Sequence, residues 1–516
     1  MSSGFLPLDP HDSQRDPEGI APVDGGAVEL PEDVYARIVE QVRQISGSLS
    51  EGHSTEDLTQ IVAEMVGELN GESVHEGSTL SSSRLVENFL PIEIPVPTVP
   101  MTLAETGVSL KMLADLTLKI LYLSGSETCE TLSRQLRLPV HLAAEGLQQL
   151  LIGGSIGMES GHGDSISNIR YQLTEQGRVE ARDVFSRNRY VGPAPVSLDQ
   201  YTRQCQAQSV SRLRLTPQQL ADTFTSEVLS SDLLNRLGPA VCSGQAILLS
   251  GPSGSGKTLI AKRLGQLVRE CGGTIYVPYA ISIENQILSL FDPTCHHPVE
   301  NQAEDHNDAR DLRWREVRRP VLSCTGELNL ELFQLKGTST GGAEVAPMQL
   351  KANGGVLVLD DIGRQRLPSS ELLNRWILPL EESKDRLTMR SGKSILIPYE
   401  LLTIFTTNRA SRDWADSAFL RRIRHKLELE VPTGEQYREI FRRCCESRHI
   451  RYDDWIVTRL LTTQYNAEHS PKASDPGDLL DVIEAICRFK GEMPHLSEQI
   501  VIEAFRECFG NDRTAA

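Results

Sequence analysis

The sequence has no apolar run of about 18 residues, the length that a membrane-spanning helix needs, and no secretory signal pattern at its start. It also has no Cys-x-x-Cys pair. Its 10 cysteines are scattered apart from Cys444–Cys445, which argues against a disulfide framework and suits a reducing compartment. We therefore expect a cytoplasmic protein without a membrane partner, and its length of 516 residues allows roughly two to four domains.

One cluster of metal-binding residue types lacks the spacing of a known metal site. Cys295, His296, His297 and His306 lie close together in a polar stretch without a recognised ligand pattern. We favour an exposed loop for this stretch, and a metal site is the alternative.

Positive charge is scarce at the start of the chain. Residues 1–100 contain 18 Asp and Glu against 4 Lys and Arg, a net charge of −14 out of −18 for the whole chain. The body of the protein is therefore nearly neutral, which argues against broad electrostatic binding to nucleic acid or to an anionic membrane.

The first 104 residues are predicted to form an acidic arm that is largely disordered. Residues 1–30 are rich in Pro, Gly, Asp and Ser, a composition typical of disorder. Two short amphipathic helices are expected to follow, and the second is the clearer, since apolar residues recur at helical spacing from Leu58 to Leu69. The stretch PIEIPVPTVP, residues 91–100, is interpreted as an extended proline-rich linker.

Residues 105–195 show a different pattern. It predicts three helices, the first over Leu110–Leu123, then two strands around the Gly- and Ser-rich loop GHGDSIS, and a last helix that opens at Thr174. This order, and YQLTEQGRVEA in particular, resembles the winged-helix family, which implies DNA binding through the third helix, at about residues 141–151. That helix contains no Lys or Arg for phosphate contacts, so we favour protein docking, with DNA binding as the alternative. Connecting helices are expected over 196–224.

A phosphate-binding motif follows. The apolar strand AILLS, residues 246–250, runs directly into GPSGSGKT, which matches G-x-x-x-x-G-K-[ST] in full and continues as a helical pattern. The glycines let the backbone N–H groups face phosphate oxygens, Lys257 reaches the β- and γ-phosphates, and Thr258 offers a hydroxyl to Mg²⁺. The predicted nucleotide-binding residues are Gly251, Pro252, Ser253, Gly254, Ser255, Gly256, Lys257 and Thr258.

Two further buried strands end in polar residues. VLVL runs into Asp360 and Asp361, and parallel sheets place their ligands at such carboxyl ends. We expect Asp360 to bind Mg²⁺ through water and Asp361 to orient or deprotonate the attacking water. LLTIFTT ends in Asn408, which could place that water, and DSAFLRRI then offers Arg421 and Arg422 at the end of a short helix.

This order of motifs resembles the AAA+ ATPases over more than half of the chain. The resemblance implies an α/β fold, with a P-loop parallel sheet flanked by helices (225–431) and an all-α lid (432–516). It implies that ATP lies between the subunits of a homo-oligomeric ring, a hexamer by analogy. Asn408 would then be the residue called sensor 1, and Arg421 or Arg422 would reach the neighbouring subunit's nucleotide, a contact that can contribute about 10³–10⁵ in rate.

Other stretches narrow the resemblance. DRLTMRSGKSILIPYELLTIFTTN predicts a hairpin with its turn at Ser391–Gly392, which resembles the pre-sensor-1 hairpin group that includes magnesium chelatase and MoxR-type ATPases. Residues 329–362 look like part of the enhancer-binding activators, but GTSTGG lacks the aromatic residue of their sigma-factor loop, so we infer no such contact. Two more stretches, LLNRWILPLEE and AFLRRI, are similar to segments of little-described bacterial AAA+ ATPases with an N-terminal winged helix.

The sequence departs from the family pattern at two positions. Asp361 stands where the superfamily usually has Glu, and a displacement of about 1 Å can cost on the order of 10²-fold in rate, so slow hydrolysis is expected. In the lid, Gly477 stands where an arginine would sense the phosphates. Lys472 is a substitute for that arginine, or else the lid does not sense the γ-phosphate.

These features predict an oligomeric ATPase that uses ATP and Mg²⁺ to remodel or regulate a protein partner. The alternative is a slow-hydrolysing nucleotide switch that regulates DNA through the winged helix. A scaffold with a degenerate site is disfavoured, because Lys257, Thr258, Asp360 and Asn408 are all present.

Overall fold

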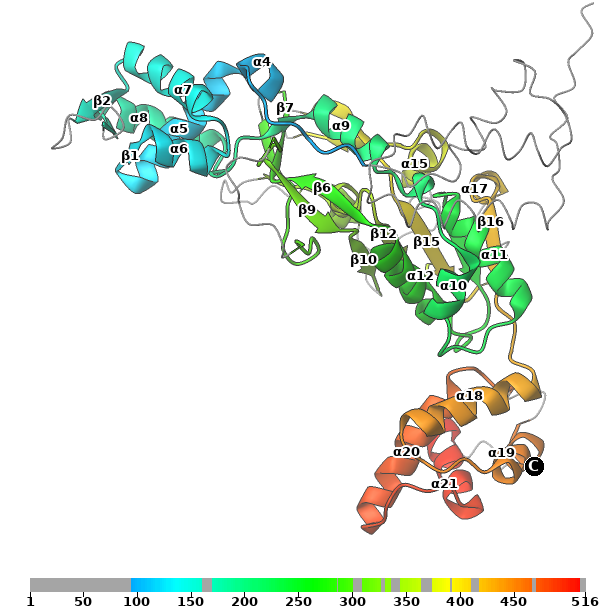
Figure 1. Ribbon diagram of the computed structural model, residues 1–516. Coiled ribbons are helices and arrows are strands. Elements are labelled where there is room, and N and C mark those ends of the chain that lie inside the picture. Colours follow the sequence, from blue (N-terminus) through cyan, green and yellow to red (C-terminus); the bar gives the residue numbers. More distant parts are fainter. Residues whose placement is uncertain are drawn as a thin grey trace, which may run out of the picture. The chain divides into compact units, whose positions relative to one another are not determined.

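The computed structural model describes ten stretches of the chain, all within the unit Ile92–Ala516 (Figure 1). These are residues 94–159, 169–284, 286–299, 309–325, 330–335, 344–362, 374–389, 392–409, 417–465 and 470–510. Several predicted features lie outside the described residues: the disordered start, the helix over Leu58–Leu69, the loop GHGDSIS and GTSTGG. No helix in the described stretches is both long and apolar enough to span a membrane.

The first module combines helices with a small antiparallel sheet of strand order β1-β3-β2. Its elements are α4 (Leu103–Thr106), α5 (Leu110–Ser124), β1 (Ser126–Thr128), α6 (Cys129–Leu136), α7 (Val140–Ile152), β2 (Ile156–Glu159), β3 (Arg170–Leu173) and α8 (Glu175–Arg187). The predicted helices and strands are present, and the Thr174 side chain caps α8 by accepting from the Gly177 amide. The short strand β1 was not predicted. The winged-helix interpretation stays a prediction.

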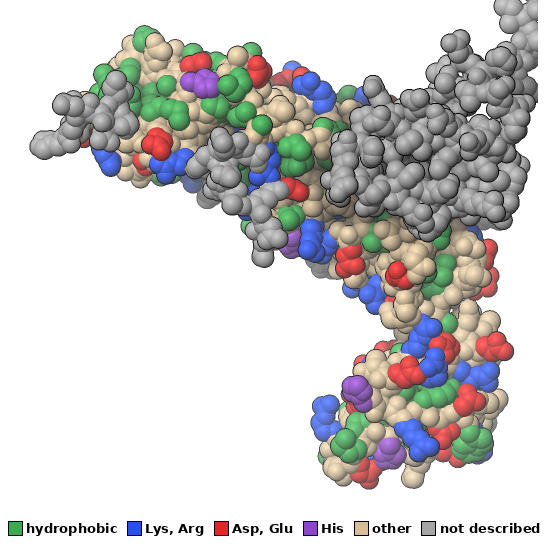
Figure 2. Space-filling model, viewed as in Figure 1, with side chains coloured by type: hydrophobic (Ala, Val, Ile, Leu, Met, Phe, Trp, Pro, Cys, Tyr) green, Lys and Arg blue, Asp and Glu red, His purple; other side chains and the backbone are tan. Residues whose placement is uncertain are grey.

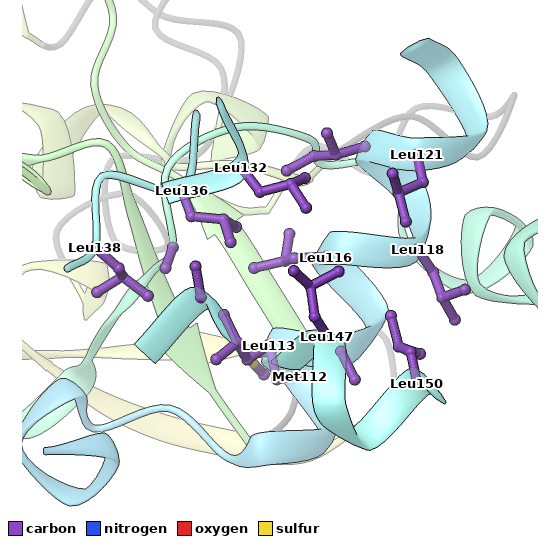
Figure 3. Close-up of a cluster of buried hydrophobic side chains, with 14 of the residues drawn as sticks. Met112, Leu113, Leu116, Leu118, Leu121, Leu132, Leu136, Leu138, Leu147 and Leu150 are labelled. Atoms are coloured by element: carbon purple, nitrogen blue, oxygen red, sulfur yellow. The ribbon is translucent and has the colours of Figure 1, made fainter. Parts of the chain in front are cut away.

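Helix α5 forms the centre of this module (Figure 3). Its residues Leu113, Leu116 and Leu121 are fully buried in one apolar cluster with residues of α6 and α7. Burying such a side chain is worth about 1.5–3 kcal/mol. The same cluster includes Ala280 and Ile287, which belong to the next domain, so the module shares its core with that domain.

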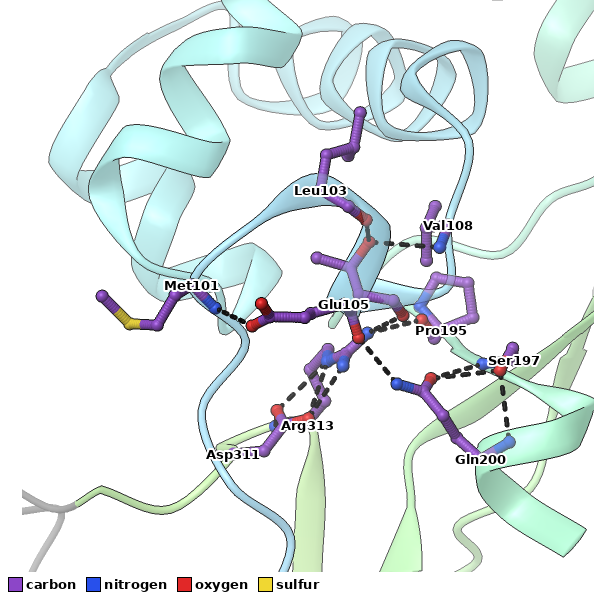
Figure 4. A network of polar contacts seen from close by, with 10 residues as sticks. Met101, Leu103, Glu105, Val108, Pro195, Ser197, Gln200, Asp311 and Arg313 are labelled. Carbon is purple, nitrogen blue, oxygen red and sulfur yellow. Dashed lines mark hydrogen bonds and ion pairs between the residues drawn. The ribbon is translucent and has the colours of Figure 1, made fainter. Parts of the chain in front are cut away.

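A buried ion pair ties both ends of the module to the next domain (Figure 4). The Arg313 guanidinium, 1% exposed, donates to both carboxylate oxygens of Asp311. It also donates to the carbonyl oxygens of Thr106 (2.7 Å) and Pro195 (3.0 Å), which lie near the two ends of the module. Removing one partner of such a buried pair typically costs about 3–5 kcal/mol, because the other charge is left buried and unpaired.

A five-stranded parallel sheet of order β10-β12-β15-β5-β16 forms the core of the next domain. Its strands are β5 (Ile247–Ser250), β10 (Val321–Cys324), β12 (Val356–Leu359), β15 (Leu402–Thr407) and β16 (His425–Glu428). The predicted strands that precede the P-loop, the two aspartates and Asn408 are thus confirmed as members of one parallel sheet.

Alternate residues of these strands face two separate apolar layers, as the period of two in a strand requires. Leu249, Val358 and Ile404 pack in the layer of helices α10 (Pro217–Thr223), α11 (Ser231–Cys242) and α12 (Lys257–Cys271). Leu359 and Phe405 pack in the opposite layer, with aromatic side chains that include Trp376 and Phe419. Helices on both faces are what buries a parallel sheet.

The remaining elements surround this sheet or form a C-terminal helical domain. They are β4 (Val196–Ser197), α9 (Leu198–Ala207), η2 (Val210–Arg212), β6 (Thr274–Pro278), β7 (Ala280–Ile283), β8 (Gln286–Ser289), β9 (Trp314–Arg318), η3 (Leu330–Phe333), β11 (Glu344–Val345), α13 (Met348–Lys351), α15 (Ile377–Glu382), β13 (Lys384–Thr388), β14 (Ser394–Pro398), α17 (Ser417–Arg422), α18 (Gly434–Ser447), α19 (Asp454–Thr463), α20 (Asp475–Lys490) and α21 (Glu498–Phe509). The predicted hairpin is confirmed, since β13 and β14 pair antiparallel.

Two expectations need correction. The described part of the proline-rich segment is hydrogen-bonded to the domain that contains the parallel sheet: the Val99 amide donates to the Ala309 carbonyl oxygen, and Thr98 forms a β-bridge with Arg310. The loop with the candidate metal ligands is not simply exposed, because His296 is fully buried. The His296 Nδ1 atom accepts from the Asp292 amide, and Nε2 bonds the Lys351 carbonyl oxygen. Both ring nitrogens are therefore used by the backbone.

Candidate functional site

The predicted phosphate-binding turn lies between β5 and α12. Gly251, Gly254 and Gly256 have φ angles of 147°, 80° and 90°, which residues other than glycine rarely adopt. At Gly251 a Cβ would also come within 2.3 Å of the Leu429 carbonyl oxygen, so no side chain fits there. The other residues of the turn are Pro252, Ser253 and Ser255.

Lys257 begins α12, and its side chain lies along the inside of this turn. It is 8% exposed. Its ammonium donates to the carbonyl oxygens of Gly251 (2.9 Å) and Pro252 (2.7 Å) and to the Ser255 hydroxyl (3.3 Å). A cation is therefore held at the N-terminus of a 15-residue helix, the place that favours a bound phosphate.

Asp360, at the end of β12, is hydrogen-bonded to the residue that follows the P-loop lysine. It directly follows β12, and its carboxylate accepts hydrogen bonds from the Thr258 hydroxyl at 2.9 and 3.0 Å. The two residues are 102 positions apart in the chain. The structure thus brings together the two residues that the sequence analysis assigned to Mg²⁺.

Thr406, in β15, is a site residue that the sequence analysis missed. Its hydroxyl donates to the Asp360 carboxylate at 2.5 Å and accepts from the Asp361 amide at 2.8 Å. Asp361 has φ 54°, a left-handed conformation. In residues other than glycine it costs on the order of 1 kcal/mol and is often found at functional sites. One hydroxyl therefore positions both aspartates.

The strand register places Asn408 at the same edge of the sheet. Thr407, the last residue of β15, pairs with Ser250, the last residue of β5. Asn408 therefore lies next to the start of the P-loop, and it is partly buried. The location agrees with the sequence analysis, and the catalytic roles of Asn408 and Asp361 stay predictions.

The two candidate arginines at the end of α17 have different surroundings. Arg422 pairs with Glu381 of α15, with its Nε atom 2.6 Å from a carboxylate oxygen. Arg421 is exposed. Phe419 of α17 and Ile423, which directly follows the helix, are buried and anchor it.

The helical domain reaches the P-loop through a turn before α20. The Ser474 amide donates to the Gly254 carbonyl oxygen at 3.1 Å. Gly477 lies in the first turn of α20, and its carbonyl oxygen accepts a long hydrogen bond from Arg448. Lys472, the predicted substitute for a lid arginine, lies in the contacting turn itself.

The oxygen atoms at this site suit Mg²⁺, which prefers carboxylates, hydroxyls, water and phosphate as ligands. Thr258 and Asp360 offer such atoms in mutual contact. In the described part of the chain, no group of 3 or more His, Cys, Asp and Glu side chains is arranged to hold a metal. Most of the coordination shell of a Mg²⁺ ion here would therefore come from phosphate oxygens and water.

Comparisons with known proteins cover parts of the chain. Residues 433–507 match the model of a domain of unknown function (DUF8689). No curated protein matches the chain.

Several solved structures are similar to part of the chain at low identity. NtrX from Brucella abortus, in complex with ADP, is 14% identical over 56% of this chain, with a TM-score of 0.33, and the match spans 55% of the NtrX chain. Domain III of DnaA from Thermotoga maritima is 12% identical over 57% of this chain and 98% of its own, with a TM-score of 0.31. The RuvB branch migration motor from Thermotoga maritima is 14% identical over 55% of this chain and 70% of its own, with a TM-score of 0.30. At such identities these matches say nothing of activity, substrate or partner.

Proposed function

We propose that this protein is an AAA+ ATPase that binds ATP with Mg²⁺ at the P-loop and hydrolyses it to remodel or regulate a protein partner in the cytoplasm. The observation that carries the proposal is the contact of the Thr258 hydroxyl with the Asp360 carboxylate. It joins a complete P-loop to the acidic end of another parallel strand of the same sheet, which is the arrangement that nucleotide hydrolysis needs.

Each residue has a distinct role in this proposal. The P-loop amides and Lys257 bind the β- and γ-phosphates, and Lys257 exchanges its bonds to the loop carbonyls for phosphate oxygens. Thr258 and Asp360 hold Mg²⁺, which when bound supplies charge neutralisation on the phosphate oxygens. Asp361 and Asn408 orient the attacking water, and Asp361 accepts its proton.

The proposal includes a homo-oligomer with nucleotide between its subunits. Arg421 supports it, because an exposed arginine on an anchored helix is suited to reach a neighbouring subunit. Arg422 is the weaker candidate, since it pairs with Glu381 in its own chain. A hexamer is expected by analogy only.

A protein partner suits the surface of the first module better than DNA does. Helix α7 carries no Lys or Arg, and its residues Val140 and Ile152 are 50% and 78% exposed. Figure 2 shows hydrophobic side chains gathered on the face of this module that is in view. The alternative, a slow-hydrolysing switch that binds DNA through this module, draws support from the shorter acid at Asp361. A titration with random duplex at low salt separates the two, because tight, salt-sensitive binding would favour DNA.

Two variants test the proposed chemistry. Lys257→Ala should abolish ATP binding, measured with a fluorescent ATP analogue, because it removes the charge that binds the phosphates. Asp361→Asn should bind ATP within a few-fold of the wild type and lose turnover, because the amide cannot accept the proton of the water. Undiminished turnover in Asp361→Asn would show that another group orients the water.

A further inference from the structure

A cavity of about 270 Å³ lies between helix α5, the end of helix α8 and strand β8. None of its lining residues belongs to the P-loop. The buried side chains of Met112, Val184 and Ile287 supply its apolar lining. Asn188, which follows α8, joins that helix to β8 by donating from its side-chain amide to the Ile287 carbonyl oxygen at 3.0 Å. The volume suits a small metabolite, since drug-sized ligands fill pockets of about 300–1,000 Å³.

Lys119, in α5, places a buried cation at this cavity. The residue is 1% exposed. Its ammonium donates to two uncharged acceptors, the carbonyl oxygens of Tyr190 (2.6 Å) and Asn188 (3.4 Å). An ammonium has three N–H donors, and the described part of the chain offers this one neither a third acceptor nor an ion pair. Burial lowers the pKa of Lys119 to about 8, so the charged form still predominates at pH 7.

Asp115 lies one helical turn before Lys119 and lines the same cavity. Opposite charges four positions apart on a helix commonly pair. Here no ion pair joins the two side chains, and none of the described residues donates a hydrogen bond to the half-buried Asp115 carboxylate. Burial raises the pKa of this carboxyl group, and nearby cations oppose that effect. Two opposite charges therefore border one cavity, each without a partner of opposite sign in contact.

The other charged groups at the cavity are more exposed. Lys111 and Arg187 line it and are exposed, and Arg187 pairs with Asp183 of its own helix. A simple anion in the cavity would satisfy Lys119 but would bring its charge close to Asp115, and a simple cation would do the reverse. A ligand that carries both charges satisfies both groups, which otherwise stay partly removed from water without compensation.

We propose that this cavity binds a small aliphatic α-amino acid. The carboxylate of the ligand accepts the remaining N–H of Lys119, its ammonium donates to Asp115, and its side chain lies against the apolar lining. Because α5 and α8 belong to the first module and β8 to the next domain, the ligand would contact both. The proposal does not depend on ATP binding or hydrolysis.

The first test is isothermal titration of the full chain with L-alanine, L-valine, L-leucine and L-methionine. At least one should bind. The matching acid without the amino group, and the matching amine without the carboxyl group, should each bind about tenfold or more weakly, the value of one charge-assisted hydrogen bond. The proposal would be overturned if none of the four bound at about 10 mM, because two such contacts should give a tighter Kd. Equal binding of the acid without the amino group would also overturn it, since the cavity would then take a simple carboxylate.

Variants locate the binding at this cavity. Asp115→Asn and Lys119→Met each remove one charge and keep the approximate shape of the side chain, so each should raise the Kd about tenfold or more. Lys111→Met is the matched control, because it removes an exposed cation from the same cavity, and its Kd should stay within about twofold of the wild type. Wild-type Kd values in Asp115→Asn would place the binding elsewhere and overturn the proposal.

A last comparison separates direct contact from a general effect on the fold. In the wild type the amino acid should bind about tenfold or more tightly than the matching acid without the amino group, and in Asp115→Asn this ratio should fall to about one. A purely structural role of Asp115 would weaken both ligands alike and leave the ratio unchanged, which would contradict the proposed contact. Urea unfolding of each variant shows that it is folded, and Asp115→Asn keeps the test decisive if Lys119→Met does not fold.

Discussion

Thr406→Val removes one hydroxyl from the buried centre of the site and leaves the shape of the side chain almost unchanged. In the wild type this hydroxyl donates to Asp360 at 2.5 Å and accepts from the Asp361 amide at 2.8 Å. The valine can do neither. Asp360 keeps its bonds from Thr258, so the two proposed Mg²⁺ ligands stay paired while both aspartates lose their shared hydrogen-bond partner.

The expected magnitude follows from these two bonds. Thr406 is 1% exposed, so water does not readily replace the lost hydroxyl. A hydrogen bond to a charged group contributes about 1.5–3 kcal/mol and a neutral one about 0.5–1.5 kcal/mol, which together predict a loss of about 2–4.5 kcal/mol in the free energy of unfolding. A displacement of Asp361 on the order of 1 Å predicts a fall in kcat of about 10- to 100-fold.

The assays are steady-state ATPase activity at saturating ATP and unfolding in urea, with Thr406→Ser as the matched control. Serine retains the hydroxyl, so its kcat should lie within about threefold of the wild type. The reasoning would be refuted if Thr406→Val turned over ATP at the wild-type rate, because the aspartates would then hold their positions without this residue.

Two further predictions concern the two arginines at the end of α17 and the buried Lys119. Arg421→Ala should lose ATPase activity in the assembled protein while its affinity for ATP stays within a few-fold of the wild type, and a large loss of ATP affinity would contradict the assignment. Arg422→Ala should lower the free energy of unfolding by less than about 1 kcal/mol, because it breaks an exposed ion pair with Glu381. Burial lowers the pKa of Lys119 to about 8, an effect that Asp115 opposes, so from pH 8 to about 10.5 the unfolded chain binds more protons at this residue, and the contribution of Lys119 to stability should rise with pH by up to about 3 kcal/mol. The difference in unfolding free energy in urea between the wild type and Lys119→Met across this range checks it, since that difference should change by this amount in favour of the wild type as the pH rises.

Local motifs made much of the fold and site predictable. The P-loop glycines and Lys257 lie next to one another in the chain, and the strands that end at Asp360 and Asn408 are short apolar runs. Because the carboxyl ends of parallel strands lie at the same edge of a sheet, the strand assignments alone predicted that these residues come together. The hairpin of β13 and β14 was predictable from its turn residues for the same local reason.

Contacts between distant segments were not predictable in this way. The role of Thr406 depends on the register of β15 against β12, and the sequence does not distinguish it from Thr403 and Thr407 of the same buried strand. The burial of His296 depends on Lys351, and the anchoring of Arg313 on Thr106, 207 positions away. No periodicity or motif records such pairings, because they arise only when the chain packs.

The most direct test of the central claim is the ATPase rate per chain against protein concentration, with light scattering on the same samples after size exclusion. The account predicts that the rate rises steeply as an oligomer forms, because Arg421 completes the site of a neighbouring subunit. A flat, near-zero rate at all concentrations, with ATP still bound, would contradict it and would favour a nucleotide switch limited by Asp361.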